Sequence, residues 1–302
     1  MPAPTASLRV PPARQGPGPI PSALVDALAL SIARRGAGVL PGDRLAPGVG
    51  SGTELAQLRP YELGDDVRQL DPAASARTGV AHVRLQVPER ILTPWLVLDL
   101  SASMAFGTAD RLKSDVAEGV AQVVARAATR HGGRLAVLTA GGGEKVLPPR
   151  GGPNAKLGLK RLLAEGVAVD GAADRGLTPV LHRAGRLARQ PGLVAVVSDF
   201  RGTLDWRRPL RSLGARHRLL AVEIRDPREE RLEPAGRLAL VDPESGRLIE
   251  VDTSRRRLRA RFAEAAAQER AAVAAELRSA RAQHVVLSTS GDWLRALGRA
   301  LR

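Results

Sequence analysis

The 302-residue chain contains no cysteine, which excludes a disulfide framework and a thiolate metal site. Its seven aromatic residues are not interleaved with basic residues, as stacking platforms for single-stranded nucleic acid require. No apolar run approaches the ~20 residues that span a bilayer. The stretch 24–33 is too short, carries Asp26 and follows a proline-rich segment, unlike a signal peptide. These absences predict a cytoplasmic protein.

Lysine is also scarce, since 42 of the 46 basic residues are arginine. A net charge of +15 suggests nucleic acid or an acidic partner. Abundant arginine, alanine, glycine and proline together are, however, typical of a GC-rich genome. We therefore keep an arginine-driven nucleic-acid binder only as an alternative and do not expect nucleic acid to be the partner.

The first ninety residues differ in composition from the rest. Residues 1–21 contain seven prolines and no periodic apolar pattern, which predicts a disordered leader. A short helix is expected from Ser22 through Ile32, and the glycine-rich segment 48–52 lacks the lysine of a phosphate loop. We predict a leader (1–21), an N-terminal extension (22–90) and a large α/β domain (91–302).

Short apolar runs alternate with amphipathic segments through this last domain. This alternation predicts a doubly wound, mainly parallel sheet with helices on both faces. Strands are expected at 95–99, 134–139, 193–198, 219–224 and 284–288, an edge strand at 144–147, and a hairpin at 237–251. Helices are expected from 109 to about 131 and at 155–165, 178–189, 206–213, 255–282 and 292–301.

The most informative stretch is 95–104, a short apolar run that leads into Asp99, Ser101 and Ser103. Open parallel sheets place ligand sites at the carboxyl ends of their strands. One carboxylate and two hydroxyls at alternate positions of a loop can converge on a hard cation such as Mg²⁺. The alternative is a helix-capping loop, in which aspartate and serine are also common.

These residues resemble the first loop of the metal-ion-dependent adhesion site of von Willebrand factor A domains. Thr178, in Gly176-Leu177-Thr178-Pro179, is similar to the second-loop threonine, and Asp199 is similar to the acidic residue after a later strand. The resemblance implies a metal site formed by Asp99, Ser101, Ser103, Thr178 and Asp199. It implies Mg²⁺ as the cofactor, with Mn²⁺ or Ca²⁺ as substitutes, and a partner protein that presents an acidic residue.

The extension carries a second resemblance. Tyr61, the run Gly64-Asp65-Asp66-Val67-Arg68 and the run Ser75-Ala76-Arg77-Thr78 resemble signatures of the bacterial family called domain of unknown function 58. One departure is Pro72, where that family usually has tryptophan. The resemblance implies an adaptor that works with a MoxR-type AAA+ ATPase or its client.

The charged residues of these signatures also have a structural interpretation, which we favour. Asp65 and Asp66 can bond to backbone amides in a turn. Arg68 and Arg77 could pair with the acids in a network that ties the extension to the main sheet. Adjacent aspartates diverge on a strand, which disfavours a catalytic dyad.

No catalytic residue is predicted. None of the five histidines stands beside a serine or aspartate in a nucleophile motif. A Mg²⁺-dependent phosphohydrolase is the alternative, because aspartates at strand ends with Mg²⁺ also serve phosphoryl transfer. Against it, Asp99 has no second aspartate nearby and none of the four lysines, at 113, 145, 156 and 160, stands at an evidently useful position. We expect a non-enzymatic, Mg²⁺-dependent protein interaction module.

Overall fold

The structure, a computed structural model, describes residues 16–18, 20–21, 23, 25, 54–87, 93–129, 132–168, 176–242 and 245–301. The predicted leader and short helix lie almost entirely outside these residues, as do the glycine-rich segment 48–52 and His131. The chain divides into two compact units, residues 37–91 and the remainder. In the described part of the chain, none of the helices combines the length and the hydrophobicity that a membrane span requires.

The smaller unit is built around an antiparallel pair of strands, β1 (Glu54–Pro60) and β2 (His82–Val87). A 3-10 turn η1 (Val67–Gln69) and the helix α2 (Pro72–Thr78) connect them. Asp71 caps α2 by accepting a hydrogen bond from the Ala74 amide, and Pro72 stands at the first helical position, where its missing N–H costs nothing. Proline at the position of the family's tryptophan therefore suits this turn.

The signature aspartates have local structural partners. Asp65 pairs with Arg59 at 2.6 Å and accepts from the Glu62 amide, while Asp66 caps η1 through the Arg68 amide. The turn interpretation is confirmed for both aspartates. The salt-bridge partner of Asp65 is Arg59, and neither Arg68 nor Arg77 pairs with it, so that part of the expected network is wrong.

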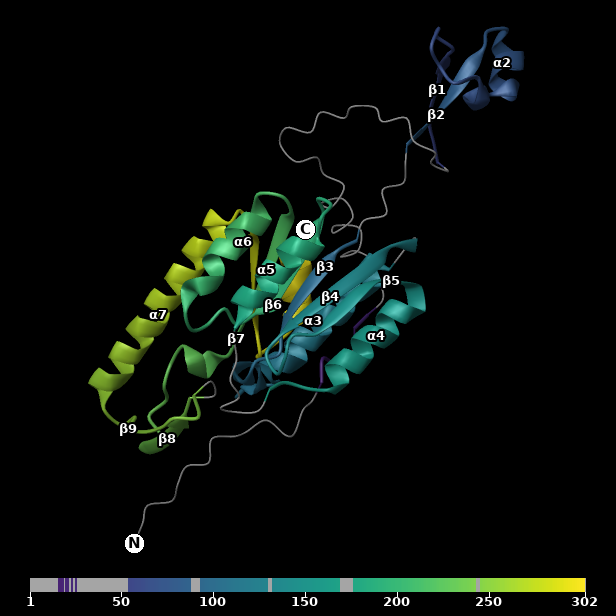
Figure 1. The fold of residues 1–302 in the computed structure, drawn as a ribbon. Helices are drawn as coiled ribbons and strands as arrows, with labels where there is room; N and C mark the ends of the chain where they lie inside the picture. Colours follow the sequence, from purple (N-terminus) through teal and green to yellow (C-terminus); the bar gives the residue numbers. More distant parts are fainter. Residues whose placement is uncertain are drawn as a thin grey trace. The chain divides into compact units, whose positions relative to one another are not determined.

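The larger unit contains the predicted α/β sheet (Figure 1). Its six strands are β3 (Trp95–Asp99), β4 (Arg134–Ala140), β5 (Val146–Gly151), β6 (Leu193–Ser198), β7 (Arg218–Arg225) and β10 (Gln283–Ser288). They lie in the order β10-β7-β6-β3-β4-β5. All neighbouring pairs are parallel except β4 and β5, which are antiparallel, so the mainly parallel sheet is confirmed.

Helices cover both faces of this sheet (Figure 1). The helices are α3 (Lys113–Ala128), α4 (Gly152–Ala164), α5 (Leu177–Leu187), α6 (Arg207–Gly214), α7 (Arg256–Ser279) and α8 (Trp293–Ala300). Side chains alternate along the fully buried β3, so Leu96 and Leu98 pack with α3, α4 and α8, while Trp95 and Val97 pack with α5, α6 and α7. The helix predicted from 109 begins at Lys113, because Asp115 accepts a hydrogen bond from the Leu112 amide and caps it there.

The predicted hairpin at 237–251 forms a separate two-stranded sheet from β8 (Arg237–Val241) and β9 (Leu248–Asp252). It leads directly into α7 (Figure 1). Leu238 pairs with Val251 and Leu240 pairs with Ile249, so one face of the hairpin carries four aliphatic side chains.

Candidate functional site

The candidate site lies where the strand order changes direction. The chain runs outward from β3 through β4 to β5 on one side and from β6 through β7 to β10 on the other. Asp99 ends β3 and Asp199 follows β6, so both stand at the carboxyl end of the sheet, at its topological switch point. Open α/β sheets bind ligands in the crevice at this point.

The loop after β3 places three of the predicted ligands together. Asp99 Oδ1 accepts a hydrogen bond from the Ser101 amide at 2.9 Å, and the Ser101 and Ser103 hydroxyl oxygens lie 3.1 Å apart. Gly141, with φ of +80°, allows the next loop to approach closely, because a Cβ there would lie 2.2 Å from the Ser101 nitrogen. The backbone around Ser101 is therefore held from two sides.

Asp199, which follows the neighbouring strand β6, is hydrogen-bonded to the loop after β3. The Ser103 hydroxyl hydrogen-bonds its carboxylate, and Asp199 Oδ1 accepts from the Arg201 amide at 3.2 Å. Phe200, which lies between Asp199 and Arg201 in the sequence, adopts φ of +53°, which is uncommon for a residue with a side chain. Its ring packs edge-on against Trp206 with centroids 5.3 Å apart. This packing keeps the sharp turn that directs Asp199 toward Ser103.

Thr178 is the least connected of the five predicted residues. It lies in the first turn of α5, half-buried, and lines the same cavity as Asp99, Ser101, Ser103 and Asp199. Its hydroxyl makes no hydrogen bond to another described residue. All five residues therefore lie around one cavity of about 1190 Å³, and four of them are joined by hydrogen bonds.

Sequence reasoning missed two direct partners of the aspartates. The Ser198 hydroxyl donates a hydrogen bond to Asp99 Oδ2 at 2.5 Å. The ammonium of Lys113 lies 2.6 Å from Asp199 Oδ2 and 2.6 Å from Glu229 Oε1. The turn from β3 into α3 brings Lys113 back over the end of the sheet, where its ammonium is already paired with two carboxylates. One feature of the sequence could have indicated this contact, namely a lysine at the start of a helix in a chain whose other basic residues are almost all arginine.

The two aspartates are electrostatically unequal. Burial, followed by the negative charge of Asp199, raises the pKa of Asp99 to about 6. Burial also acts to raise the pKa of Asp199, but the charge and hydrogen bond of Lys113 outweigh it and hold that pKa below its ordinary value. For Lys113, burial acts to lower the pKa, and the charges of Asp199 and Glu229 outweigh it and raise the pKa. Within the described residues, Asp99 has no cationic side chain of its own.

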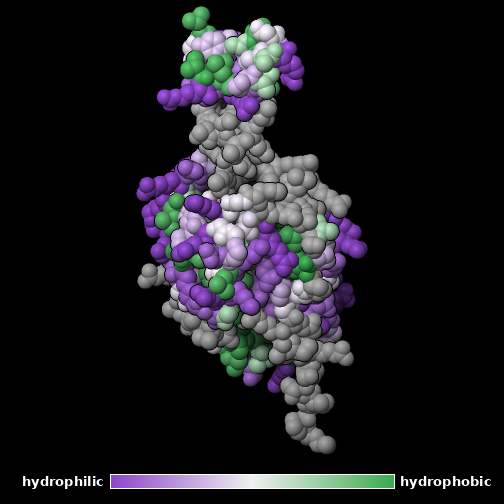
Figure 2. All heavy atoms as spheres, turned by 90° about the vertical axis from the view of Figure 1, so that its right-hand side faces the viewer, coloured by the Kyte–Doolittle hydropathy of each residue, from purple (hydrophilic) through white to green (hydrophobic). Residues whose placement is uncertain are grey.

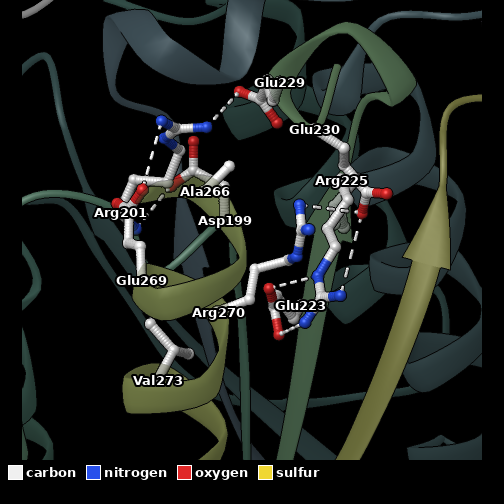
Figure 3. Close-up of a pocket in the computed structure, with 11 residues that line it drawn as sticks. Asp199, Arg201, Glu223, Arg225, Glu229, Glu230, Ala266, Glu269, Arg270 and Val273 are labelled. Carbon is white, nitrogen blue, oxygen red and sulfur yellow. Dashed lines mark hydrogen bonds and ion pairs between the residues drawn. The ribbon is translucent and has the colours of Figure 1, made fainter. Parts of the chain in front are cut away.

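A band of ion pairs borders the site (Figure 3). Arg201, two residues after Asp199, contacts Glu229 on η5 (Pro227–Glu229) and Glu269 on α7, at 3.5 and 3.4 Å. Arg270 of α7 contacts Glu230 at 3.2 Å. These contacts connect the loop after β7 with α7 beside the candidate ligands. Half-exposed pairs of this kind contribute little each, about 0–1 kcal/mol.

The donor set fits a hard divalent cation. Two carboxylates and three hydroxyls offer only oxygen, which is the ligand type that Mg²⁺ takes. A bound cation would also compensate the charge of Asp99. No group of three or more histidine, aspartate or glutamate side chains in the described part of the chain is arranged to hold a metal, so any site here depends on the hydroxyls.

Comparison with known proteins identifies the family. The profile described as "Protein of unknown function DUF58" matches residues 57–272. The chain belongs to the DUF58 family. DUF58 relatives include "Uncharacterized protein Mb1516" of Mycobacterium bovis and "Uncharacterized protein Rv1480" of Mycobacterium tuberculosis. Each is 38% identical over 276 residues, which cover 90% of this chain and 86% of the relative.

Solved structures similar to this DUF58 chain include a "conserved hypothetical protein BatB" from Bacteroides thetaiotaomicron, with 13% identity, a TM-score of 0.44, and coverage of 70% of this chain and 97% of that one. A "von Willebrand factor type A" structure from Catenulispora acidiphila has 16% identity, a TM-score of 0.38, and coverage of 70% and 41%. The fold assignment rests on the sheet topology itself.

Proposed function

We propose that this DUF58 chain is a Mg²⁺-dependent protein interaction module. The observation that carries the proposal is Asp99, a buried carboxylate with a raised pKa that lies beside Ser101 at the switch point of the sheet. Bound Mg²⁺ would supply a Lewis-acidic position that a carboxylate of a partner protein can occupy. Asp99, Ser101, Ser103, Thr178 and Asp199 are the residues that would hold it.

The residues of the chain would contribute unequally to binding the ion. Asp99 supplies the uncompensated charge, and Ser198 orients its carboxylate. Lys113 already neutralises part of Asp199, so Asp199 is suited to a weaker or water-mediated contact with the ion. The hydroxyls of Ser101 and Ser103 add neutral ligands without adding repulsion. This balance favours a metal that binds reversibly and keeps a position for the partner.

The partner class comes from the family resemblance. We propose a MoxR-type AAA+ ATPase, or the client of one, which presents an acidic residue, with this chain acting as an adaptor in assembly or remodelling. The support from this chain is a cavity of about 1190 Å³ around the candidate ligands, which leaves room for a segment of another protein.

Thermal melts with Mg²⁺ or EDTA test the metal. A ligand that binds only the folded state raises its melting temperature. We expect millimolar Mg²⁺ to raise the melting temperature of the wild type and to leave Asp99→Asn unchanged. The matched control is Asp205→Asn, since Asp205 lines the same cavity, is exposed and is not a predicted ligand. Equal Mg²⁺ shifts in the wild type and Asp99→Asn would refute the metal site.

Capture of the ATPase tests the partner. The MoxR-type ATPase from the same organism would be purified and passed over immobilised wild-type protein in Mg²⁺ or in EDTA. We expect retention in Mg²⁺ alone, and no retention by Asp99→Asn in either buffer. Retention that EDTA does not change would contradict the metal-dependent mechanism while leaving the partnership standing.

A further inference from the structure

The cavity at the candidate site extends well beyond the candidate ligands. One side is lined by the loop after β3, the start of α5 and the turn after β6. The other side is lined by the β8–β9 hairpin and Phe262 of α7. We call this cavity the hairpin groove. The predicted metal ligands use only one end of it.

The hairpin wall of the groove is apolar and incompletely covered. Leu238, Leu240, Ile249 and Val251 all line the groove, and they occupy one face of the hairpin through the pairs Leu238–Val251 and Leu240–Ile249. Ile249 is 47% exposed, and Leu238 and Leu240 are only half-buried. A two-stranded sheet is marginal by itself, and this aliphatic face gains stability when it is covered.

The groove is acidic in a chain that is strongly basic. Among the described residues, seven carboxylates line it, against two guanidinium groups, whereas the whole chain carries a net charge of +15. The buried ammonium of Lys113 pairs with two of these carboxylates, those of Asp199 and Glu229. Both arginines are already paired, Arg201 with Glu229 and Glu269 and Arg228 with Glu233. The surface in Figure 2 is mostly hydrophilic, with apolar side chains in small separate groups. The seven carboxylates are those of Asp99, Asp199, Asp205, Glu229, Glu233, Asp242 and Glu269.

A buried N–H group in the groove has no acceptor among the described residues. Trp206 lines the groove and is 3% exposed, and its Nε1–H makes no hydrogen bond to any described residue. A buried donor without an acceptor destabilises the protein. An occupant with backbone carbonyls can supply that acceptor after a small movement of the indole, whereas a purely hydrocarbon occupant cannot.

We propose that the hairpin groove binds an extended segment of a partner protein in which apolar and basic residues alternate. Alternation places the apolar side chains on one side of an extended strand, against the hairpin wall, and the basic side chains on the other, toward the groove carboxylates. The charge of the groove makes the opposite pattern, apolar with acidic residues, unfavourable away from the metal. This binding does not need Mg²⁺ and therefore goes beyond the metal-dependent capture proposed above.

Three synthetic peptides test the occupant by fluorescence anisotropy with the full chain in EDTA. One alternates leucine with arginine, the second replaces arginine with glutamate, and the third replaces leucine with serine. We expect only the leucine–arginine peptide to bind, with affinity that falls as salt rises, because exposed charges are screened. It should change the tryptophan fluorescence of the wild type, and this change should be lost in Trp206→Phe. Equal binding of the glutamate peptide, or no binding of any peptide at low salt, would overturn the proposal.

Charge reversal locates the binding. In the double variant Asp205→Arg, Glu233→Arg we expect affinity for the leucine–arginine peptide to fall at least about tenfold. The same variant should begin to bind the leucine–glutamate peptide. The control is Glu250→Arg, because Glu250 lies on β9 between two groove-lining residues and faces the other side of the hairpin. Unchanged affinity in the double variant would overturn the proposal, as would a loss as large in Glu250→Arg.

Two further measurements distinguish binding of a partner segment in the groove from dimer formation and from binding at the metal site. Sedimentation of the wild type should show monomers at the assay concentration, whereas dimers that exclude the peptide would assign the groove to a second copy and overturn the proposal. The double variant Asp205→Arg, Glu233→Arg should keep the Mg²⁺ shift of the wild type while it loses affinity for the leucine–arginine peptide, because neither residue is a predicted metal ligand. If the melting experiments refute the metal site, the peptide experiments still test the groove. If the peptide experiments refute the groove, the melting experiments still test the metal site.

Discussion

Lys113 and Asp199 form a buried ion pair, with Nζ 2.6 Å from Oδ2 and the lysine side chain entirely inaccessible to solvent. The same ammonium contacts Glu229 and lies over the ring of Phe106 at 5.8 Å from its centroid. The pair joins the first turn of α3 to the end of β6 and to η5. It therefore combines a structural role with control of the charge at the candidate metal site.

Loss of this lysine should be costly. Lys113→Met keeps the length of the side chain but leaves Asp199 and Glu229 as buried carboxylates without their shared cation. Breaking a buried pair costs about 3–5 kcal/mol, so we expect the free energy of unfolding in EDTA to fall by that amount. Urea denaturation measures the change. Mg²⁺ should restore more stability to this variant than it adds to the wild type, because the cation replaces part of the missing charge.

Lys145→Met is the matched control. Lys145 pairs with Glu165, and both side chains are about half exposed, so the expected loss is about 0–1 kcal/mol. A Lys113→Met variant as stable as Lys145→Met would contradict the electrostatic role of Lys113.

The raised pKa of Asp99 predicts a pH dependence of stability in EDTA. The folded-state pKa is about 6 and the ordinary value is 3.8, so folding favours the protonated form. The resulting stability is present in full below about pH 4 and is lost as pH rises through about 6, by up to about 3 kcal/mol. Relative to Asp99→Asn, the wild type should therefore become less stable between these pH values. Melting curves of both proteins across that range measure the difference, and a difference that stays constant would contradict the raised pKa.

The arrangement around Lys113 also bears on the phosphohydrolase alternative. A lysine that assists phosphoryl transfer must reach the phosphate, but Lys113 is enclosed and already bonds two carboxylates. We expect no hydrolysis of ATP or of a phosphate monoester above the buffer rate. Turnover that survives repurification and disappears in Asp99→Ala would establish the enzyme instead.

Binding to nucleic acid is the remaining alternative function, which the net charge of +15 suggests. Several arginines that border α7 are occupied, for example Arg211 with Glu276 at 2.6 Å and Arg270 with Glu230 at 3.2 Å. We expect no binding to double-stranded DNA even at low salt. Affinity that falls steeply with salt, and that is lost when Arg255, Arg256 and Arg257 are replaced by glutamine, would show a nucleic-acid surface.

The sequence by itself determined the sheet and the position of Asp99 and Asp199 at its carboxyl edge. Five predicted strands match β3, β4, β6, β7 and β10 to within about one residue, because buried strands need continuous apolar runs and their ends are marked by turn residues. Aspartates that follow two such runs must then lie at the carboxyl edge of a parallel sheet. Local chemistry also determined the turn roles of Asp65 and Asp66, whose partners lie within six residues.

Only the tertiary structure decided which side chains neutralise those aspartates. Lys113 is 86 residues from Asp199 along the chain, and Ser198 is 99 residues from Asp99. No periodicity or spacing encodes such pairs, because they depend on how a helix packs over a sheet and on the direction of each turn. The hairpin groove likewise exists only where the face of β8 and β9 meets the loops of the main sheet. Charge balance at a buried site is a property of three-dimensional packing, whereas the apolar pattern that forms the sheet is local.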